Sequence, residues 1–268
     1  MPTSQWRLNN EVKVEGGLRA SVDLGIVNLA TVYVEDGDWY IFKGGGVLSQ
    51  YECYSKRISR VQKLLARHKQ RGSRKLKLLY DKRRRFLRHA LNCMVRRIMS
   101  DLKEKGVGEV VIGYPKDISR KHGNKLDTNF WNYGYVIKRF EDVGEELGIK
   151  IVKVGEGYSS KKCSLCGEAH EGGRIKRGLY KCPRIGKVIN ADLNGAMNIL
   201  HIPESLRAAD GGLSAARDRG NGLKTQPAVY RWTSGAGWVL DAPTSREAVR
   251  MKAVNHEPMT RPKGTPAL

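Results

Sequence analysis

Residues 18–34 read LRASVDLGIVNLATVYV, a run of alternating and then continuous apolar residues, many of them β-branched. Such residues favour strands. The acidic turn EDGD at 35–38 leads into a second apolar run, WYIFKG, at 39–44. We therefore expect two antiparallel strands that meet at this turn.

The pattern downstream alternates between strand and helix. GEVVIGYP (108–115) and IKIVKVGE (149–156) have the composition of buried strands, and NFWNYGYVIKRFEDVGEELG (129–148) has helical periodicity and ends at a glycine. INADLNGAMNILHI (189–202) predicts a short helix whose small residues allow close approach to a sheet. The order of elements predicts a mixed α/β sheet.

Positive charge dominates the composition and gathers in one segment. The chain has 49 Lys and Arg against 27 Asp and Glu, and residues 56–105 hold 19 of these cations against three acids. Apolar residues recur there at helical intervals with a break, RGSR, at 71–74, so we expect a basic helical hairpin over 49–105. A solvated charged face is the alternative, but a like-charge block of this density favours phosphate contact. The candidate contacts are Lys56, Arg57, Arg60, Arg83, Arg84, Arg85 and Arg88.

Cysteine usage and hydropathy indicate the compartment. Five cysteines are an odd number, and no apolar run approaches the ~20 residues that cross a bilayer. These features predict a cytoplasmic chain that does not enter a membrane and holds a metal site rather than disulfides. Residues 203–268 are rich in Gly, Ala, Arg and Pro, which predicts a largely disordered tail.

Three acids stand where elements end or begin. Asp23 and Glu156 lie at the ends of predicted strands, and Asp192 lies in the first turn of the last helix. Each alone has an ordinary structural explanation, because strand-end acids face solvent and acids favour helix N-termini. In an α/β chain that attracts polyanions, the three together form the set that holds two divalent ions for phosphodiester hydrolysis.

Three longer motifs resemble a known family. SVDLGIVNLATV (21–32), YSSKKCSLCG (158–167) and INADLNGAMNIL (189–200) are similar to the first RuvC motif, the zinc-ribbon opening and the third RuvC motif of TnpB proteins, and they occur in the family's order. The resemblance implies an RNase H-like (RuvC) mixed sheet over residues 21–202, with the helical hairpin and a zinc ribbon at 161–187 as insertions. Complete members of this transposase-associated family, relatives of type V CRISPR effectors, cleave DNA guided by RNA.

The second RuvC motif departs from the family pattern. The family's strand usually ends in glutamate, whereas VVIGYPKDIS (110–119) has Gly113 there. Glu156 ends the next strand of the sheet and is the first candidate replacement. Asp117, on the following loop, is the second, and loss of the ligand is the third possibility.

The zinc ribbon departs as well. Cys163 and Cys166 form one knuckle and Cys182 begins another, but Ile185 stands where a fourth cysteine would be. His170 could complete a Cys3His tetrahedron, and the alternative is a ribbon without metal. Cys53 and Cys93, which have no ligand spacing, are interpreted as structural.

The resemblance covers the second half of complete family members. We therefore expect residues 1–20 to be a remnant and the chain to be an N-terminally truncated copy. The expected function is a TnpB-type RuvC endonuclease that binds DNA and a guide RNA, with structural Zn²⁺ and catalytic Mg²⁺ or Mn²⁺. The alternatives are a nucleic-acid-binding remnant that does not cleave and a general transposase with the same metal chemistry.

Overall fold

The computed structural model of the chain describes residues 17–114, 130, 132–155, 162–176, 178–202 and 227–241. Its helices and strands, in chain order, are β1 (Leu18–Leu24), β2 (Asn28–Val34), β3 (Trp39–Lys43), α1 (Gly45–Arg67), α2 (Arg74–Glu104), β4 (Val107–Tyr114), α5 (Tyr133–Leu147), β5 (Lys150–Gly155), β6 (Arg174–Lys176), β7 (Leu179–Lys181), β8 (Val188–Asn190), α6 (Ala191–Leu200), β9 (Ala228–Thr233) and β10 (Gly237–Leu240). Seven strands form one sheet in the order β10-β9-β3-β2-β1-β4-β5, and β6, β7 and β8 form a second.

The large sheet is mixed, as the sequence predicts. Strands β1, β2 and β3 are antiparallel, whereas β4 pairs parallel with both β1 and β5. The expectation of a single strand over 18–34 is wrong, because the chain turns at Gly25 and returns as β2. A Cβ on Gly25 would lie 2.9 Å from the carbonyl oxygen of Asn28, so glycine is what permits this tight turn.

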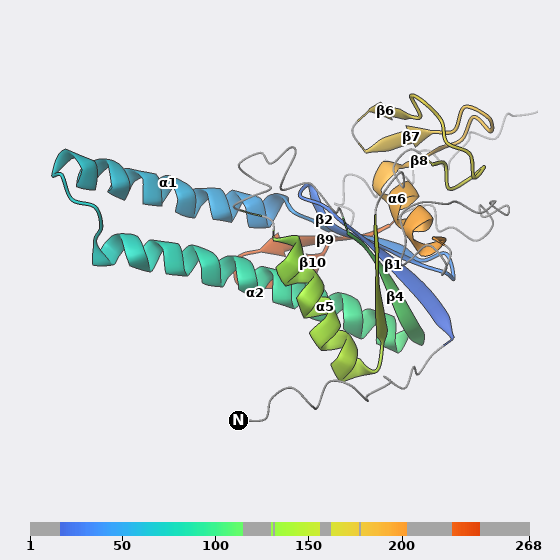
Figure 1. Cartoon of the computed structure of the whole chain (residues 1–268), viewed down its shortest axis with the longest axis horizontal. Coiled ribbons are helices and arrows are strands. Elements are labelled where there is room, and N and C mark those ends of the chain that lie inside the picture. Colours follow the sequence, from blue (N-terminus) through green and yellow to red (C-terminus); the bar gives the residue numbers. More distant parts are fainter. Residues whose placement is uncertain are drawn as a thin grey trace, which may run out of the picture.

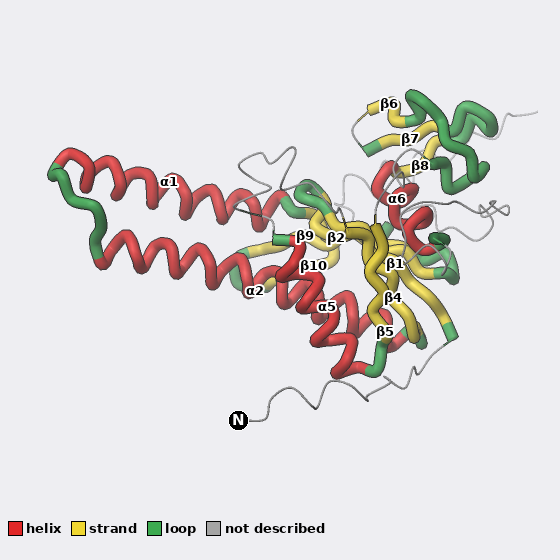
Figure 2. The backbone as a smooth tube through the Cα atoms, in the orientation of Figure 1, coloured by secondary structure: helices red, strands yellow, loops and turns green. Residues whose placement is uncertain are grey.

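Helices cover both faces of the sheet (Figures 1 and 2). Val110 and Ile112 of β4 pack in the core formed with α2 and α5, whereas Val111 between them packs in the core formed with α6. This alternation follows from the two-residue period of a strand. It divides the molecule into an α2–α5 side and an α6 side, which is the distinction that positions the candidate site.

Helices α1 and α2 pack together and extend well beyond the sheet (Figure 1). The break at 71–74 falls between them, where Ser73 caps α2 by accepting a hydrogen bond from the backbone N–H of Leu76 at 3.1 Å. Buried residues of α2 are concentrated in its second half, from Ala90 to Leu102. The first half, together with most of α1, is therefore held mainly by the other helix of the pair.

The expectation of a largely disordered tail is wrong for residues 228–240. Strand β9 pairs parallel with β3, and β10 pairs antiparallel with β9, so both extend the edge of the large sheet. The ring of Tyr230 stacks on Phe42 with centroids 4.6 Å apart, and the indole Nε1 of Trp238 donates to the carbonyl of Ala90 at 2.9 Å. Among the described residues, no helix is long and apolar enough to cross a membrane.

Candidate functional site

Asp23 lies on the α6 side of the sheet. Its neighbours Val22 and Leu24 pack toward α2 and α5, so strand alternation directs Asp23 the opposite way. Two residues earlier, Ser21 confirms this direction by donating a hydrogen bond from its hydroxyl to the carbonyl of Ala196 in α6, at 2.6 Å. The half-buried Asp23 carboxylate therefore faces the helix that carries Asp192.

A glycine allows these two elements to meet. A Cβ on Gly195 would lie only 2.7 Å from Asp23 Oδ2, closer than real Cβ contacts come. Gly195 follows Asp192 by three residues, so the two positions are neighbours on one face of α6. The structure thus brings Asp23 from β1 beside the first turn of α6, where Asp192 lies.

Hydrogen bonds hold both the backbone and the carboxylate of Asp192. Asn190 caps the helix by accepting hydrogen bonds from the backbone N–H groups of Asp192 and Leu193, at 2.9 and 3.1 Å. The side-chain amide of Asn28 donates to Asp192 Oδ2 at 2.5 Å, and an Arg174 guanidinium nitrogen lies 3.9 Å from Oδ1. Carboxylate oxygens with amide neighbours are suited to hard divalent cations such as Mg²⁺, so the donor set fits the implied ions.

The position of the missing family glutamate lies on the same side. Gly113 follows Val111 by two residues in β4, and Val111 packs with α6. Gly113 therefore faces the region of Asp23 but supplies no ligand. Glu156 and Asp117, its candidate replacements, lie outside the described residues.

The three cysteines and the histidine expected to bind zinc come together. The ligand atoms of Cys163, Cys166, His170 and Cys182 all lie within 4.8 Å of one another, and the four residues could hold a metal ion. His170 Nε2 is 3.0 Å from Cys166 Sγ and 3.8 Å from Cys182 Sγ. A tetrahedral zinc site, with metal–ligand distances of ~2.0–2.3 Å, separates its ligands by roughly 3.3–3.8 Å, so the cluster needs little adjustment.

Both knuckles contain the same backbone hydrogen bond. In each, the glycine four residues after the cysteine donates its N–H to that cysteine's carbonyl at 2.8 Å, and the glycine, Gly167 or Gly186, has positive φ. The second knuckle thus forms although Ile185 replaces a cysteine. Burial raises the pKa of the Cys163 thiol to about 11, so a cation must displace a proton to bind there at neutral pH.

The cysteine cluster is tied to α6. Asn194 accepts a hydrogen bond from the backbone N–H of Ser164 and donates to the carbonyl of Lys162, both at 2.8 Å. Asn198, one turn further on, donates to the same carbonyl at 2.7 Å. The first knuckle is therefore fixed to the helix whose first turn contains Asp192.

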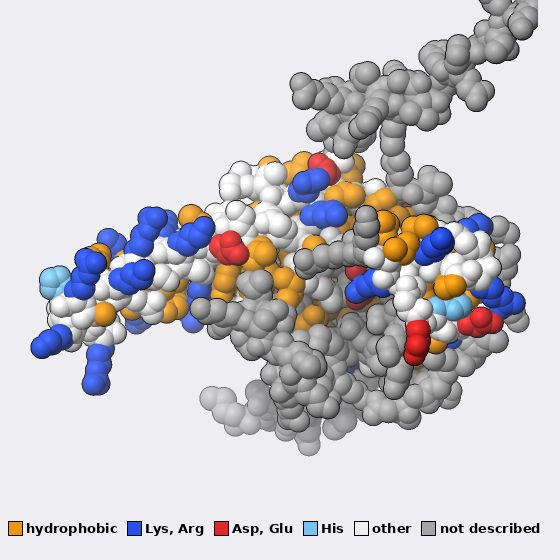
Figure 3. Space-filling model, turned by 90° about the horizontal axis from the view of Figure 1, so that it is seen from above, with side chains coloured by type: hydrophobic (Ala, Val, Ile, Leu, Met, Phe, Trp, Pro, Cys, Tyr) orange, Lys and Arg blue, Asp and Glu red, His pale blue; other side chains and the backbone are white. Residues whose placement is uncertain are grey.

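The predicted phosphate contacts lie along the hairpin. Figure 3 shows Lys and Arg side chains gathered over its distal part. Six of the seven candidates are exposed, namely Lys56, Arg57, Arg60, Arg84, Arg85 and Arg88. Arg84 also forms an ion pair with Asp81 at 2.7 Å, which leaves most of its guanidinium in solvent.

Arg83 differs from the other six. Its guanidinium carbon lies 4.7 Å from the ring centroid of Tyr51 and 5.2 Å from that of Tyr80. It also donates to the Ser55 hydroxyl at 2.9 Å. Arg83 is half-buried between α1 and α2 and contributes to their packing.

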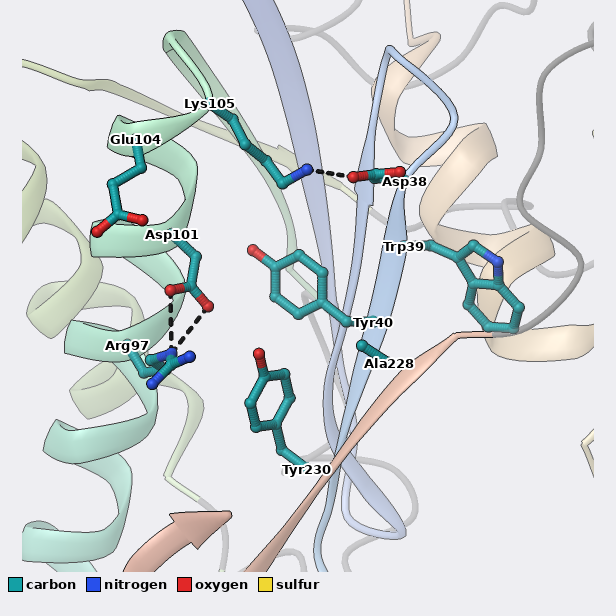
Figure 4. A pocket seen from close by; sticks show the side chains of 9 residues that line it. All are labelled: Asp38, Trp39, Tyr40, Arg97, Asp101, Glu104, Lys105, Ala228 and Tyr230. Atoms are coloured by element: carbon teal, nitrogen blue, oxygen red, sulfur yellow. Dashed lines mark hydrogen bonds and ion pairs between the residues drawn. The ribbon is translucent and has the colours of Figure 1, made fainter. Parts of the chain in front are cut away.

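A groove of about 610 Å³ opens on the opposite, α2–α5 side of the sheet, between β3, β9 and the end of α2. Figure 4 shows the Tyr40 hydroxyl pointing toward α2 and the Tyr230 hydroxyl pointing toward Tyr40, in a groove that the ion pairs Arg97–Asp101 and Lys105–Asp38 also line. Burial raises the pKa of Tyr40 well above its usual value, with Asp101 the next cause. This groove is separate from the acids of the α6 side.

Sequence reasoning missed Asn28 and Gly195, which touch the two acids. Both stand within the quoted RuvC-like motifs, and a glycine inside a predicted helix is a signal of close approach. What Gly195 approaches could not be inferred, because Asp23 is far away in the chain.

Family models match both parts of the domain. Residues 4–119 match a family described as "Probable transposase", and residues 133–199 match the Cas12f1-like TNB domain. TnpB-like protein ORF457 of Acidianus two-tailed virus is 34% identical over 199 residues, covering 70% of this chain and 42% of the relative. The TnpB-like protein aq_aa05 of Aquifex aeolicus is 35% identical over 109 residues, covering 38% and 35%. The chain thus spans less than half the length of these relatives.

Solved structures share the fold. A Cas12f1–sgRNA–target DNA complex matches with a TM-score of 0.55 at 21% identity, covering 68% of this chain and 49% of that one. A CRISPR-Cas12f ternary complex matches with a TM-score of 0.60 at 22% identity, covering 76% and 40%. The mixed sheet, the motif order and both family models agree, and the chain belongs to the TnpB family.

Proposed function

We propose that this chain is a metal-dependent DNA endonuclease of the RuvC type, guided by RNA. The observation that carries the proposal is the contact of the Asp23 carboxylate with Gly195, one turn from Asp192. A related protein of Sulfoacidibacillus thermotolerans, 38% identical over 80 residues that are 30% of this chain and 19% of the relative, is described as a CRISPR-associated endodeoxyribonuclease. This description supports DNA as the substrate.

Asp23, Asp192 and Glu156 would hold two Mg²⁺ or Mn²⁺ ions. Such ions supply an activated water and stabilise the leaving oxygen of a phosphodiester. The task of the chain's own residues is to keep carboxylates ionised and aimed at one point. The helix cap at Asn190 and the amide of Asn28 do this for Asp192, and Gly195 leaves room for Asp23.

Glu156 is our candidate for the third ligand. Val154, two residues before it, packs on the α6 side, which agrees with a ligand donated from this end of β5. Asp117 is the rival.

We further propose that Cys163, Cys166, His170 and Cys182 bind a structural zinc ion. Soft thiolates and an imidazole in a closed four-ligand set favour zinc over hard cations. The hairpin would bind phosphates of DNA and guide RNA through its exposed cations.

A nucleic-acid-binding protein that does not cleave is the second candidate function. The observation that favours it is Gly113, which faces the acid pair without supplying a carboxylate. The two candidates differ in whether a third carboxylate, Glu156 in our proposal, completes the site.

The test measures cleavage of labelled DNA by the chain, purified with its co-purifying RNA, in Mg²⁺ or Mn²⁺. Because ligands of one site act as a unit, Asp23→Asn, Asp192→Asn and Glu156→Gln should each lower cleavage roughly a thousandfold or more while DNA binding persists. Asp117→Asn should cleave normally. DNA binding by the wild-type chain without metal-dependent cleavage would instead favour the second candidate.

A further inference from the structure

Asn28 occupies an unusual place in the acid site. It is the first residue of β2, and the tight turn at Gly25 returns it to the end of β1 that carries Asp23. From there its side chain reaches α6 and donates to Asp192 Oδ2 at 2.5 Å. Asn28 thus connects the strand end that bears one acid with the helix that bears the other.

This contact fixes which way the amide points. An ionised carboxylate only accepts hydrogen bonds, so the NH₂ group of Asn28 must face Asp192 and the amide oxygen must face away. That oxygen, Oδ1, is buried and accepts no hydrogen bond from any residue that the structure describes. A buried amide oxygen without a donor is costly, which indicates that a group other than the described side chains satisfies it.

Asn28 Oδ1 lies beside the Asp192 carboxylate, and this neighbour indicates what kind of group satisfies the oxygen. Amide oxygens, carboxylates and water are the ligands that hard divalent cations take. Mutation of an outer residue that orients a ligating carboxylate typically lowers metal affinity about 10- to 100-fold. Asn28 offers both features, a donor on Asp192 and a free acceptor beside it.

We propose that Asn28 is a positioning residue of the divalent-ion site, whose Nδ2 holds Asp192 and whose Oδ1 accepts a hydrogen bond from water bound to the ion. This inference rests on the proposed function, because it assumes that Asp23 and Asp192 bind a divalent cation. It adds a residue from outside the acidic set and predicts that removing its amide affects the ion-bound state more than the ion-free state.

The experiment uses the full chain and Mn²⁺ as the probe. Asn28→Leu removes the donor and the acceptor at similar volume, and Asn28→Ala does so without bulk. Asn92→Leu is the matched control, because Asn92 is a half-buried asparagine of α2 that accepts one hydrogen bond from the Tyr135 hydroxyl at 2.8 Å. Electron paramagnetic resonance of free Mn²⁺ gives the affinity, and thermal unfolding with and without Mn²⁺ gives the stabilisation by the ion.

Both Asn28 variants should bind Mn²⁺ about 10- to 100-fold more weakly than the wild type and gain less thermal stability from it. Without Mn²⁺ the unfolding temperatures of both Asn28 variants should be no lower than that of the Asn92→Leu protein. The Asn92→Leu protein should bind Mn²⁺ with wild-type affinity. Equal losses of stability with and without Mn²⁺, at unchanged affinity, would reduce Asn28 to a structural role and overturn this inference alone. If the wild-type chain shows no Mn²⁺ binding that Asp23→Asn abolishes, the ion site and the role of Asn28 both fail.

Discussion

Gly195 controls how closely the Asp23 carboxylate approaches α6. Replacing a helical glycine by alanine usually stabilises a protein by about 0.5–1 kcal/mol. Here the added Cβ would lie 2.7 Å from Asp23 Oδ2 and must displace it. We therefore expect Gly195→Ala to weaken Mn²⁺ binding about tenfold or more, as measured by titration of the chain with the ion.

Gly45→Ala is the control for this change. Gly45 is also helical, at the start of α1, and a Cβ there would meet nothing within 4 Å. It should leave Mn²⁺ affinity unchanged. Equal affinities of the Gly195→Ala and Gly45→Ala proteins would contradict the close approach.

Tyr40 should make the fold sensitive to alkali. Burial raises its pKa above the usual value of 10, so above about pH 10 the unfolded chain loses this proton before the folded chain does. Its contribution to the free energy of unfolding therefore falls as pH rises beyond that point. Tyr40→Phe should remove this part of the alkaline loss in urea unfolding between pH 9 and 11.

At neutral pH the same variant should stay within about 1 kcal/mol of wild type, because the hydroxyl has no hydrogen-bond partner among the described residues. Tyr54→Phe, on α1, is the control that tests whether removing any tyrosine hydroxyl reduces the alkaline loss of stability. If both variants follow the same pH dependence as wild type, Tyr40 does not cause the loss.

The hairpin is the element whose charge should matter most. Arg57, Arg60 and Arg85 are exposed and have no ion pair among the described residues. Changing all three to glutamine should reduce the log–log salt slope of duplex binding by up to about 2.7, or about 0.9 for each phosphate that the variant no longer binds. Filter binding or fluorescence anisotropy from 50 to 300 mM salt measures the slope.

Two controls separate phosphate contact from other effects. Arg231→Gln with Lys138→Gln removes exposed charges on β9 and α5 and should leave the slope almost unchanged. Arg83→Gln should instead destabilise the hairpin, since its guanidinium packs on Tyr51. A triple variant with wild-type affinity and slope would make the hairpin a solvated face.

The small sheet should depend on its metal. We expect one zinc per chain by elemental analysis, and chelation should disorder β6, β7 and β8, because a structural zinc contributes folding free energy directly. His170→Ala should lower the zinc content. His68→Ala, at the end of α1, should not, and a His170→Ala protein with full zinc content would exclude histidine from the ligand set.

Elements could be predicted where the signal is local. The break near Ser73 and the end of α5 at Gly148 follow from capping and turn residues, and the structure agrees with both. The division of 18–34 into two strands was missed because its apolar run continues through the turn at Gly25. Strands β9 and β10 were missed because they are short and gain their stability from pairing with β3, a contact that no local pattern records.

The acid site could be predicted only in part, because some of its residues belong to local motifs and others are brought there by packing. Asp23, Asp192 and the cysteine spacing can be read as motifs, and His170 was a chemical inference from the absence of a fourth cysteine. The contacts of Asn28 and Gly195 join residues more than 160 positions apart. They depend on how β1, β2 and α6 pack, which only the three-dimensional structure supplies.

The whole molecule depends on the β9–β10 pair to cover the aromatic edge of the sheet. Trp238 packs edge to face on Phe42 with centroids 5.1 Å apart and donates to the carbonyl of Ala90. Because Trp238 is only half-buried, Trp238→Ala should lower the free energy of unfolding by about 2–3 kcal/mol, below the ~3–5 of a fully buried tryptophan. Trp238→Phe keeps a ring and should lose only about 1 kcal/mol. Urea unfolding measures the free energy of unfolding of both variants. Equal losses in the Trp238→Ala and Trp238→Phe proteins would mean that an aromatic ring at this position contributes little.

The position of β9 in the chain affects how the protein is made. The hydrogen bond from Trp238 to Ala90 joins residues 148 apart, and one from Ser234 to Gln50 joins residues 184 apart. Synthesis proceeds from the N-terminus, so β3 leaves the ribosome long before the strand that pairs with it. Until then Phe42 and the backbone edge of β3 are open to other chains, and this edge is where self-association during translation would begin.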